Sequence, residues 1–136
     1  MNYKELVVWQ KAMQLVKEIY KLTRLLPKEE TYALSDQIRR AAVSVPSNIA
    51  EGYGRSANRD YAHFLSIARG STYELDTQLN IAVMLDFITT EQTQEALTLC
   101  EECGRMLNAM IKKIAPPRPN PYVVHPMSRT FLILSV

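Results

Sequence analysis

Residues 61–82 read YAHFLSIARGSTYELDTQLNIA, and the apolar or small side chains in this stretch recur at alternating steps of four and three. That spacing places them on one side of an α-helix. The predicted core positions are Tyr61, Leu65, Ala68, Thr72, Leu75, Leu79 and Ala82. Asn58 precedes the stretch and is predicted to cap the helix N-terminus. The pattern indicates a long helix with one buried face.

Two earlier segments show the same periodicity. Residues 6–26 form a helix that ends at Pro27, because proline disfavours the helical conformation of the residue before it. Its core stripe is Val8, Ala12, Leu15, Ile19, Leu22 and Leu26, with a second stripe of Leu6, Trp9, Met13, Val16 and Tyr20. Residues 31–53 continue their apolar period through Pro46, so one kinked helix is expected rather than two in tandem.

A fourth helix is predicted for residues 89–114. Thr89 and Gln92 stand three residues apart, as in a capping box. The core positions in register are Leu97, Cys100, Gly104, Leu107, Ile111 and Ile114, and a second apolar stripe contains Leu99, Cys103, Met106 and Met110. Burial against another subunit and a broad core face both explain the second stripe, and the sequence leaves the two open.

Together these segments predict an all-α fold. Short connections make neighbouring helices antiparallel, so residues 1–115 are expected to form one up-down four-helix bundle. Five of the seven prolines lie between Pro116 and Pro126, which predicts an extended, irregular tail over residues 116–136. The tail ends in TFLILSV, and we expect this apolar run to dock on its own bundle or on a neighbour, unless it is simply disordered.

Composition restricts the class of protein. The chain has 136 residues, of which 47% are apolar, enough for one domain with a hydrophobic core. Charges are scattered through its first residues, unlike a signal peptide, and no apolar run approaches the roughly 20 residues that a bilayer requires. Two cysteines suit a reducing compartment. We therefore expect a soluble, cytoplasmic protein with no membrane segment.

The cysteines and histidines are the first places to look for chemistry. Cys100 and Cys103 match a C-x-x-C pattern, but they lie in mid-helix beside two glutamates, which raise a thiol pKa. Zinc would need two more ligands, and only His63 and His125 are present. We predict that the cysteines pack in the core and that His63 lies at the surface. The sequence predicts no catalytic site, no metal and no cofactor.

The turn after the second helix contains Gly52-Tyr53-Gly54-Arg55. It superficially resembles a phosphate-binding loop, but it follows a helix rather than a strand and lacks the lysine of such loops. We expect the two glycines to end the helix and to turn the chain. Arg55 and Arg59 flank the start of the third helix, whose free N–H groups favour an anion.

Seven basic residues are the candidates for contact with nucleic acid. The net charge is only +2, but residues 1–26 carry +3, from five Lys and Arg residues against two Glu residues. In that segment basic residues at i, i+4 and i+7 share a helix face. The candidates are Lys17, Lys21, Arg24, Arg39, Arg40, Arg55 and Arg59. An ordinary solvated surface explains the same pattern, and both interpretations stay open.

Three stretches resemble a known family. They are LVVWQKA at residues 6–12, QIRRAAVSVPSNIAEG at 37–52 and FLSIARGSTYEL at 64–75. The family is that of the four-helix-bundle proteins, also called 23S ribosomal RNA intervening-sequence proteins, and the likeness runs from about residue 3 to residue 114. The chain departs from the pattern at Ala33, where the family commonly has glycine, and over residues 116–136, which have no counterpart.

The resemblance implies an up-down bundle that assembles into a homopentamer, encoded in some bacteria inside insertions in ribosomal RNA genes. The family is also similar to accessory proteins of diversity-generating retroelements, which bind a reverse transcriptase and nucleic acid. It implies no catalytic residues. We therefore expect a non-catalytic, oligomeric adaptor that binds RNA or DNA, with structured RNA as the first candidate. The alternative is a protein–protein scaffold that docks a partner, such as a reverse transcriptase, through the ring surface or the tail.

Overall fold

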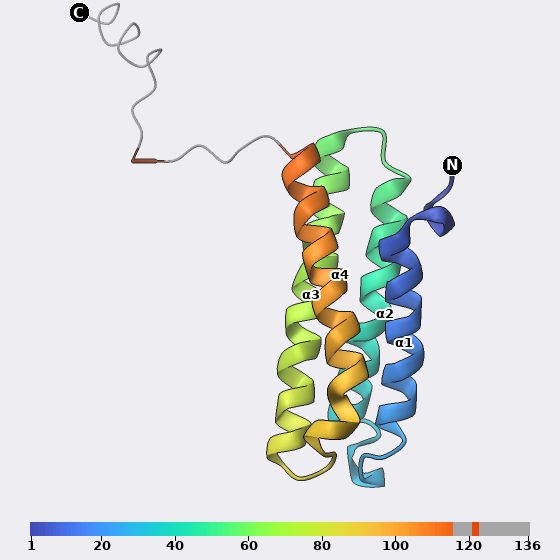
Figure 1. Ribbon diagram of the computed structural model, residues 1–136, viewed down its shortest axis with the longest axis vertical. Helices are drawn as coiled ribbons and strands as arrows, with labels where there is room; N and C mark the ends of the chain where they lie inside the picture. The colour runs from blue at the N-terminus through green and yellow to red at the C-terminus, as the bar shows by residue number, and fades with distance from the viewer. Residues whose placement is uncertain (116–120, 123–136) are drawn as a thin grey trace, which may run out of the picture.

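The computed structural model describes residues 1–115 and 121–122. The described chain forms a short turn η1 (Tyr3–Glu5), then α1 (Val7–Thr23), a second turn η2 (Lys28–Glu30), α2 (Leu34–Tyr53), α3 (Asn58–Met84) and α4 (Thr90–Ile114). Successive helices run antiparallel, and each packs against its two neighbours around a square (Figure 1). The predicted all-α, up-down four-helix bundle is confirmed. Apart from residues 121–122, the predicted tail over residues 116–136 lies outside the described residues.

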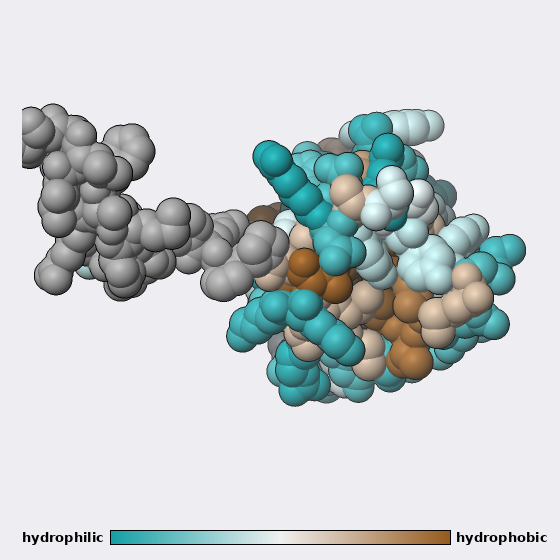
Figure 2. Space-filling view, turned by 90° about the horizontal axis from the view of Figure 1, so that it is seen from above, coloured by the Kyte–Doolittle hydropathy of each residue, from teal (hydrophilic) through white to brown (hydrophobic). Residues whose placement is uncertain are grey.

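The core is a column of apolar side chains enclosed by the four helices. Viewed from the end that carries the N-terminus, apolar side chains lie among hydrophilic ones that project around the periphery (Figure 2). All six core positions predicted for residues 6–26 are buried, although α1 ends at Thr23 and Leu26 lies in the connection after it. The largest fully buried side chains include Leu15, Ile19, Ile38, Leu65, Leu75 and Leu107. Within residues 1–115, no helix is both long enough and apolar enough to cross a bilayer.

The start of α3 differs from the prediction. Asn58 is the first helical residue, and Ala57 holds the N-cap position without a side-chain hydrogen bond. Ala62 is buried at the start of the core stripe, whereas Tyr61 is only half-buried and stands edge-on to Tyr53, with ring centroids 6.2 Å apart. The remaining predicted core positions of α3 are buried. The error therefore concerns the first turn and leaves the helix register unchanged.

The core stripe of α4 also differs from the prediction. Leu99 and Cys103, assigned to the second stripe, are buried, whereas Leu97 and Gly104 are half-buried. Met106 and Met110, also of the second stripe, are partly buried and pack against the part of the core that contains Cys103. A broad core face thus accounts for the second stripe of α4. The predicted capping box of Thr89 and Gln92 is confirmed.

α2 is a single helix that runs through Pro46, as expected, and contacts α3 through a small polar layer. The Ser44 and Ser71 hydroxyls are hydrogen-bonded at 2.8 Å. Asn48 Nδ2 donates to the Ser44 carbonyl, also at 2.8 Å. These polar groups lie beside an otherwise apolar interface, and each of the three side chains has a partner.

The expected role of the glycines at the end of α2 holds for Gly54, which is the C-cap residue, but it is wrong for Gly52. No described glycine has a positive φ, and Gly52 lies buried inside the helix. A Cβ atom at Gly52 would lie 2.8 Å from Phe64 Cβ, closer than side chains tolerate. Gly52 is therefore required by the close approach of α2 and α3 rather than by a left-handed turn.

Candidate nucleic-acid interface

The seven basic candidates fall into two groups at opposite ends of the bundle (Figure 1). Five lie along the second half of α1, directly after it, or on the facing start of α2: Lys17, Lys21, Arg24, Arg39 and Arg40. Arg55 and Arg59 lie at the connection between α2 and α3. The stretch of α2 from Arg40 to Tyr53 is about 20 Å long at the rise of an α-helix. The candidates therefore do not form one continuous surface.

Two hollows lie between α1 and α2 beside the larger group, of which Arg24, Arg39 and Arg40 line them and Lys17 and Lys21 do not. The first has a volume of about 380 Å³ and is lined by Tyr20, Thr23, Arg24, Leu26, Lys28, Thr31 and Arg39. The second has a volume of about 350 Å³ and is lined by Tyr20, Asp36, Arg39, Arg40, Val43 and Ser44. We call the α1–α2 basic surface the set Lys17, Lys21, Arg24, Lys28, Arg39 and Arg40. In this part of the described chain, cations from the end of α1, from η2 and from α2 line concave space.

The cations of the α1–α2 basic surface differ in how far the protein already engages them. Arg39 Nη2 donates to the Thr31 carbonyl at 3.0 Å, which fixes its guanidinium beside both hollows. Lys21 Nζ pairs with the Glu18 carboxylate at 3.1 Å. No ion pair or side-chain hydrogen bond within residues 1–115 engages the remaining four: Lys17, Arg24, Lys28 and Arg40. Most of the positive charge here is thus available to an external anion.

The smaller group has less charge to offer. Arg55 forms an ion pair with Glu51 one turn earlier, and its guanidinium carbon lies 4.8 Å from the centroid of the Phe64 ring. Arg59 is exposed in the first turn of α3. Because Glu51 balances the charge of Arg55, Arg59 is the cation that remains for an anion at this turn.

The sequence reasoning missed two residues at these hollows, Lys28 and the aromatic Tyr20. Tyr20 is the more informative of the two. It had been placed in an apolar stripe, but 42% of it is exposed and it lines both hollows. The sequence did contain a sign of this position: Tyr20 lies three residues after Lys17 and four before Arg24, so it shares their helix face. An exposed aromatic ring among cations is the arrangement by which proteins stack unpaired bases.

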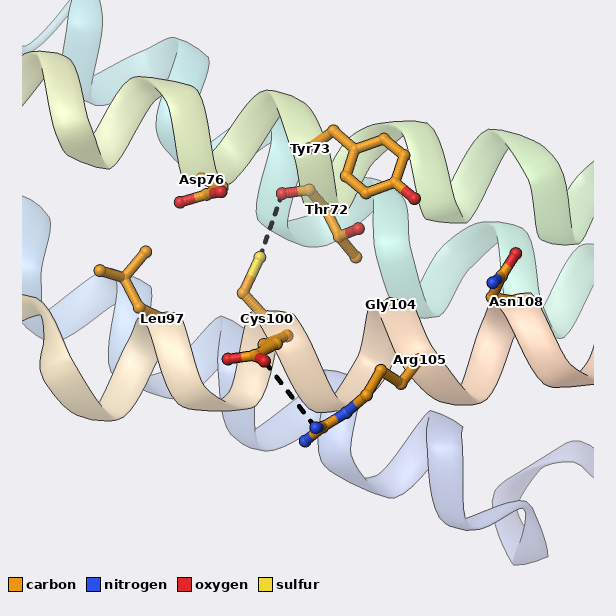
Figure 3. A pocket seen from close by; sticks show the side chains of 9 residues that line it. Thr72, Tyr73, Asp76, Leu97, Cys100, Gly104, Arg105 and Asn108 are labelled. Atoms are coloured by element: carbon orange, nitrogen blue, oxygen red, sulfur yellow. Dashed lines mark hydrogen bonds and ion pairs between the residues drawn. The ribbon is translucent and has the colours of Figure 1, made fainter.

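A third hollow lies between α3 and α4, away from the basic candidates. Its volume is about 440 Å³, and Figure 3 shows Thr72, Tyr73 and Asp76 of α3 across it from Leu97, Cys100 and Asn108 of α4. The Cys100 thiol donates to the Thr72 carbonyl at 3.1 Å. Asn108 accepts a hydrogen bond from Arg69 at 2.8 Å. The polar side chains of the hollow are thus largely committed to contacts within the chain.

The two cysteines are buried, as predicted. Burial is the main reason why the pKa of Cys100 is raised to about 12, with a further contribution from the nearby Asp76 carboxylate. Burial likewise raises the pKa of Cys103 to about 11, aided by Glu102 and opposed by Lys11. Both thiols are therefore protonated near neutral pH and are poor nucleophiles.

The remaining candidates for chemistry lie apart from one another. His63 is exposed, as predicted, and its ring stands edge-on to Phe64, with centroids 5.7 Å apart. No group of three or more His, Cys, Asp or Glu side chains in the described part of the chain could hold a metal ion. Glu102 pairs with Lys11 of α1 at 2.8 Å and so ties α4 to α1. His63 and Glu102 thus each contact a neighbouring side chain of the bundle, and they do not come together at one reaction centre.

Comparison with known proteins agrees with this geometry. A search of curated proteins found no match. Among solved structures, a crystal structure of a protein of unknown function from the S23 ribosomal protein family of Bacteroides thetaiotaomicron VPI-5482 is similar. Its TM-score is 0.73 at 27% sequence identity, and the match covers 78% of this chain and 99% of that one. The family model of the 23S rRNA-intervening sequence protein matches residues 4–109, most of the four helices. The chain belongs to the 23S rRNA-intervening sequence protein family.

Proposed function

We propose that the protein is a non-catalytic adaptor that binds structured RNA in the cytoplasm through the α1–α2 basic surface. The observation that carries the proposal is that four basic side chains, Arg24, Lys28, Arg39 and Arg40, line two hollows that share Tyr20 and Arg39. Neutralising phosphates with lysine and arginine releases counterions, which drives most of the affinity of proteins for nucleic acids. The family is named for an intervening sequence of 23S rRNA, which supports RNA as the polyanion.

The absence of catalysis in this proposal rests on the cysteines and on His63. A cysteine nucleophile needs a thiolate and a base within hydrogen-bond reach. The Cys100 thiol instead donates a hydrogen bond to the Thr72 carbonyl, and its raised pKa keeps the thiol protonated. His63 is on the exposed side of α3, whereas Cys100 and Cys103 face the core. An adaptor needs none of these groups to react.

Reversing two free charges of the basic surface tests the RNA proposal. We expect Arg24→Glu/Arg40→Glu to weaken binding of a fluorescein-labelled RNA hairpin by about tenfold or more at about 50 mM salt, measured by fluorescence anisotropy. Neither arginine has an intrachain partner among the described residues, so the fold should survive. For the unmodified protein, affinity should fall on the order of a hundredfold between about 50 mM and 200 mM salt if some five cations contact phosphates.

The matched control is Lys112→Glu/Lys113→Glu. These two residues are exposed in the last turn of α4, away from the basic surface, and the substitution changes the net charge equally. We expect it to alter RNA affinity by no more than about twofold. If both double variants lose RNA affinity equally, the loss is due to net charge and not to the α1–α2 basic surface. If the unmodified protein binds no RNA at low salt, the proposal is refuted.

We further propose that the protein works as a homo-oligomer that associates through the hollow between α3 and α4. Gly104 lines this hollow, yet a Cβ there would meet only Thr72 Oγ1, at an ordinary 3.5 Å. Glycine inside a helix costs about 1 kcal/mol relative to alanine. Packing within the chain explains that cost at neither Gly70 nor Gly104, but of the two only Gly104 lines the hollow, where a helix from another copy could approach closely. Repeating the basic surface around an assembly would multiply its effective affinity.

The molar mass in solution tests the assembly. We expect the unmodified protein to have a multiple of the 15.5 kDa chain mass by light scattering, and Gly104→Gln, which fills the hollow, to shift the mass towards 15.5 kDa. Gly70→Gln is the matched control, because Gly70 is exposed with no side-chain neighbour within 4 Å. An unmodified protein of 15.5 kDa would contradict self-association. It would leave the alternative function, a scaffold that docks a partner protein, without the ring surface proposed for it.

A further inference from the structure

The two hollows of the α1–α2 basic surface differ in their linings. Arg24, Lys28 and Arg39 line the first, and no carboxylate of the described residues does. The second contains Asp36 together with Arg40. A phosphate is repelled by a carboxylate, whereas the amino groups on the edge of a base are hydrogen-bond donors that a carboxylate accepts. The first hollow therefore suits a phosphate and the second suits the base attached to it.

Tyr20 and Arg39 belong to both hollows and thus stand between them. The Arg39 guanidinium is held by the Thr31 carbonyl, so its position does not depend on a ligand. Tyr20 is 42% exposed, and no hydrogen bond within the described residues engages its hydroxyl. An aromatic ring offers a π-face to any unpaired base, and base stacking on such a ring adds affinity that tolerates different sequences.

We propose that Tyr20 stacks an unpaired nucleotide, with its base over the second hollow and its phosphate in the first. This inference rests on the proposed RNA binding and names the part of the RNA that the surface selects. Bases in a duplex are stacked on each other and cannot reach Tyr20, whereas bases in loops and bulges can. The preferred ligand is accordingly a structured RNA with an open loop, not a continuous duplex. The volumes of about 380 and 350 Å³ fall within the range of small-ligand sites.

The test compares two RNAs and four substitutions in the full chain. We expect Tyr20→Ala to weaken binding of a hairpin with an open loop by about tenfold, the loss typical of one stacked base, and to leave binding of a blunt duplex of the same stem unchanged. Tyr20→Phe keeps the ring and should bind within about twofold of the unmodified protein. The salt dependence should be the same for all, because no phosphate contact is removed.

Tyr32→Ala is the matched control. Tyr32 is 95% exposed in the turn before α2 and lines neither hollow, so its removal should leave the affinity for both RNAs unchanged. Tyr20→Trp gives a direct measure of stacking, because a base stacked on the new indole quenches its fluorescence. The hairpin should quench this fluorescence and the duplex should not, a difference that a purely structural role of residue 20 would not produce. Circular dichroism of each variant establishes that the bundle is intact.

The outcomes separate this inference from the proposed function. If Tyr20→Ala binds the hairpin as the unmodified protein does, or loses hairpin and duplex equally, stacking is refuted. Loss of binding in Tyr20→Phe would assign the effect to the hydroxyl and refute it as well. If Arg24→Glu/Arg40→Glu weakens RNA binding while Tyr20→Ala does not, the proposed function stands without stacking. If the unmodified protein binds neither RNA, both fall.

Discussion

The free energy of unfolding is expected to fall by about 2 kcal/mol when Gly52 is replaced by alanine, although alanine is the better helix former. The new Cβ atom would lie 2.8 Å from Phe64 Cβ and 3.1 Å from a ring carbon of Tyr61. Phe64 Cβ is bonded directly to the backbone of α3, so the clash cannot be relieved by a side-chain rotation. α2 and α3 must separate, which loosens the packing around Ile49 and Leu65 in the same part of the core.

Gly70→Ala is the control for this prediction. Gly70 is an exposed residue in the middle of α3, and a Cβ there meets nothing within 4 Å. The same substitution should therefore raise the free energy of unfolding by about 1 kcal/mol through helix propensity alone. Urea unfolding followed by circular dichroism measures both values. A Gly52→Ala variant as stable as Gly70→Ala would show that the two helices are not as close as described.

The second large effect is a loss of stability in alkaline solution. Burial raises the pKa of Cys100 and Cys103 from 9.0 to about 12 and about 11, so the folded protein holds both thiol protons more tightly than the unfolded chain. The resulting stabilisation is complete below pH 9 and is lost as the pH rises through the folded-state values. We expect the free energy of unfolding to fall on the order of 2 kcal/mol per thiol by pH 11.

Urea unfolding at a series of pH values from 8 to 11 measures this loss. The double variant Cys100→Ala/Cys103→Ala should be less stable at pH 8, since it loses buried volume, but should depend less steeply on pH. A residual slope above pH 10 is expected from Tyr61, whose pKa is also raised, mainly by burial and then by Tyr53. Parallel pH profiles for the double variant and the unmodified protein would exclude the thiols as the cause.

The helices could be predicted because their information is local. The α1 stripe from Val8 to Leu22 follows one period, and every predicted position in it is buried. The capping box of Thr89 and Gln92 depends on residues three apart, which the sequence places without any tertiary contact. The choice in α4 between Leu99 with Cys103 and Leu97 with Gly104 depends instead on where α1 and α3 lie. Two neighbouring stripes of similar hydrophobicity do not contain that information.

The candidate site shows the same limit. Which cations are free depends on partners such as Glu51 for Arg55 and Glu18 for Lys21, and these lie within one helical turn. Local spacing could have found them. The meeting of Tyr20 with Arg39 and Arg40 requires the alignment of α1 beside α2, which no local pattern sets. The sequence therefore identified individual basic residues as candidates. Their grouping around two hollows could not be predicted from it.

The hydrogen bond between Ser44 and Ser71 has a consequence for how α2 and α3 choose their alignment. Apolar stripes repeat along both helices, so a slide of one helix by seven residues would again bring small and apolar side chains opposite each other. The slide would separate the two hydroxyls and leave the buried Ser71 hydroxyl facing apolar groups, whereas the half-buried Ser44 stays within reach of water. An unpaired buried hydroxyl costs about 1–3 kcal/mol. The serine pair thus adds little to the strength of the interface but makes the shifted pairings less stable than the native one.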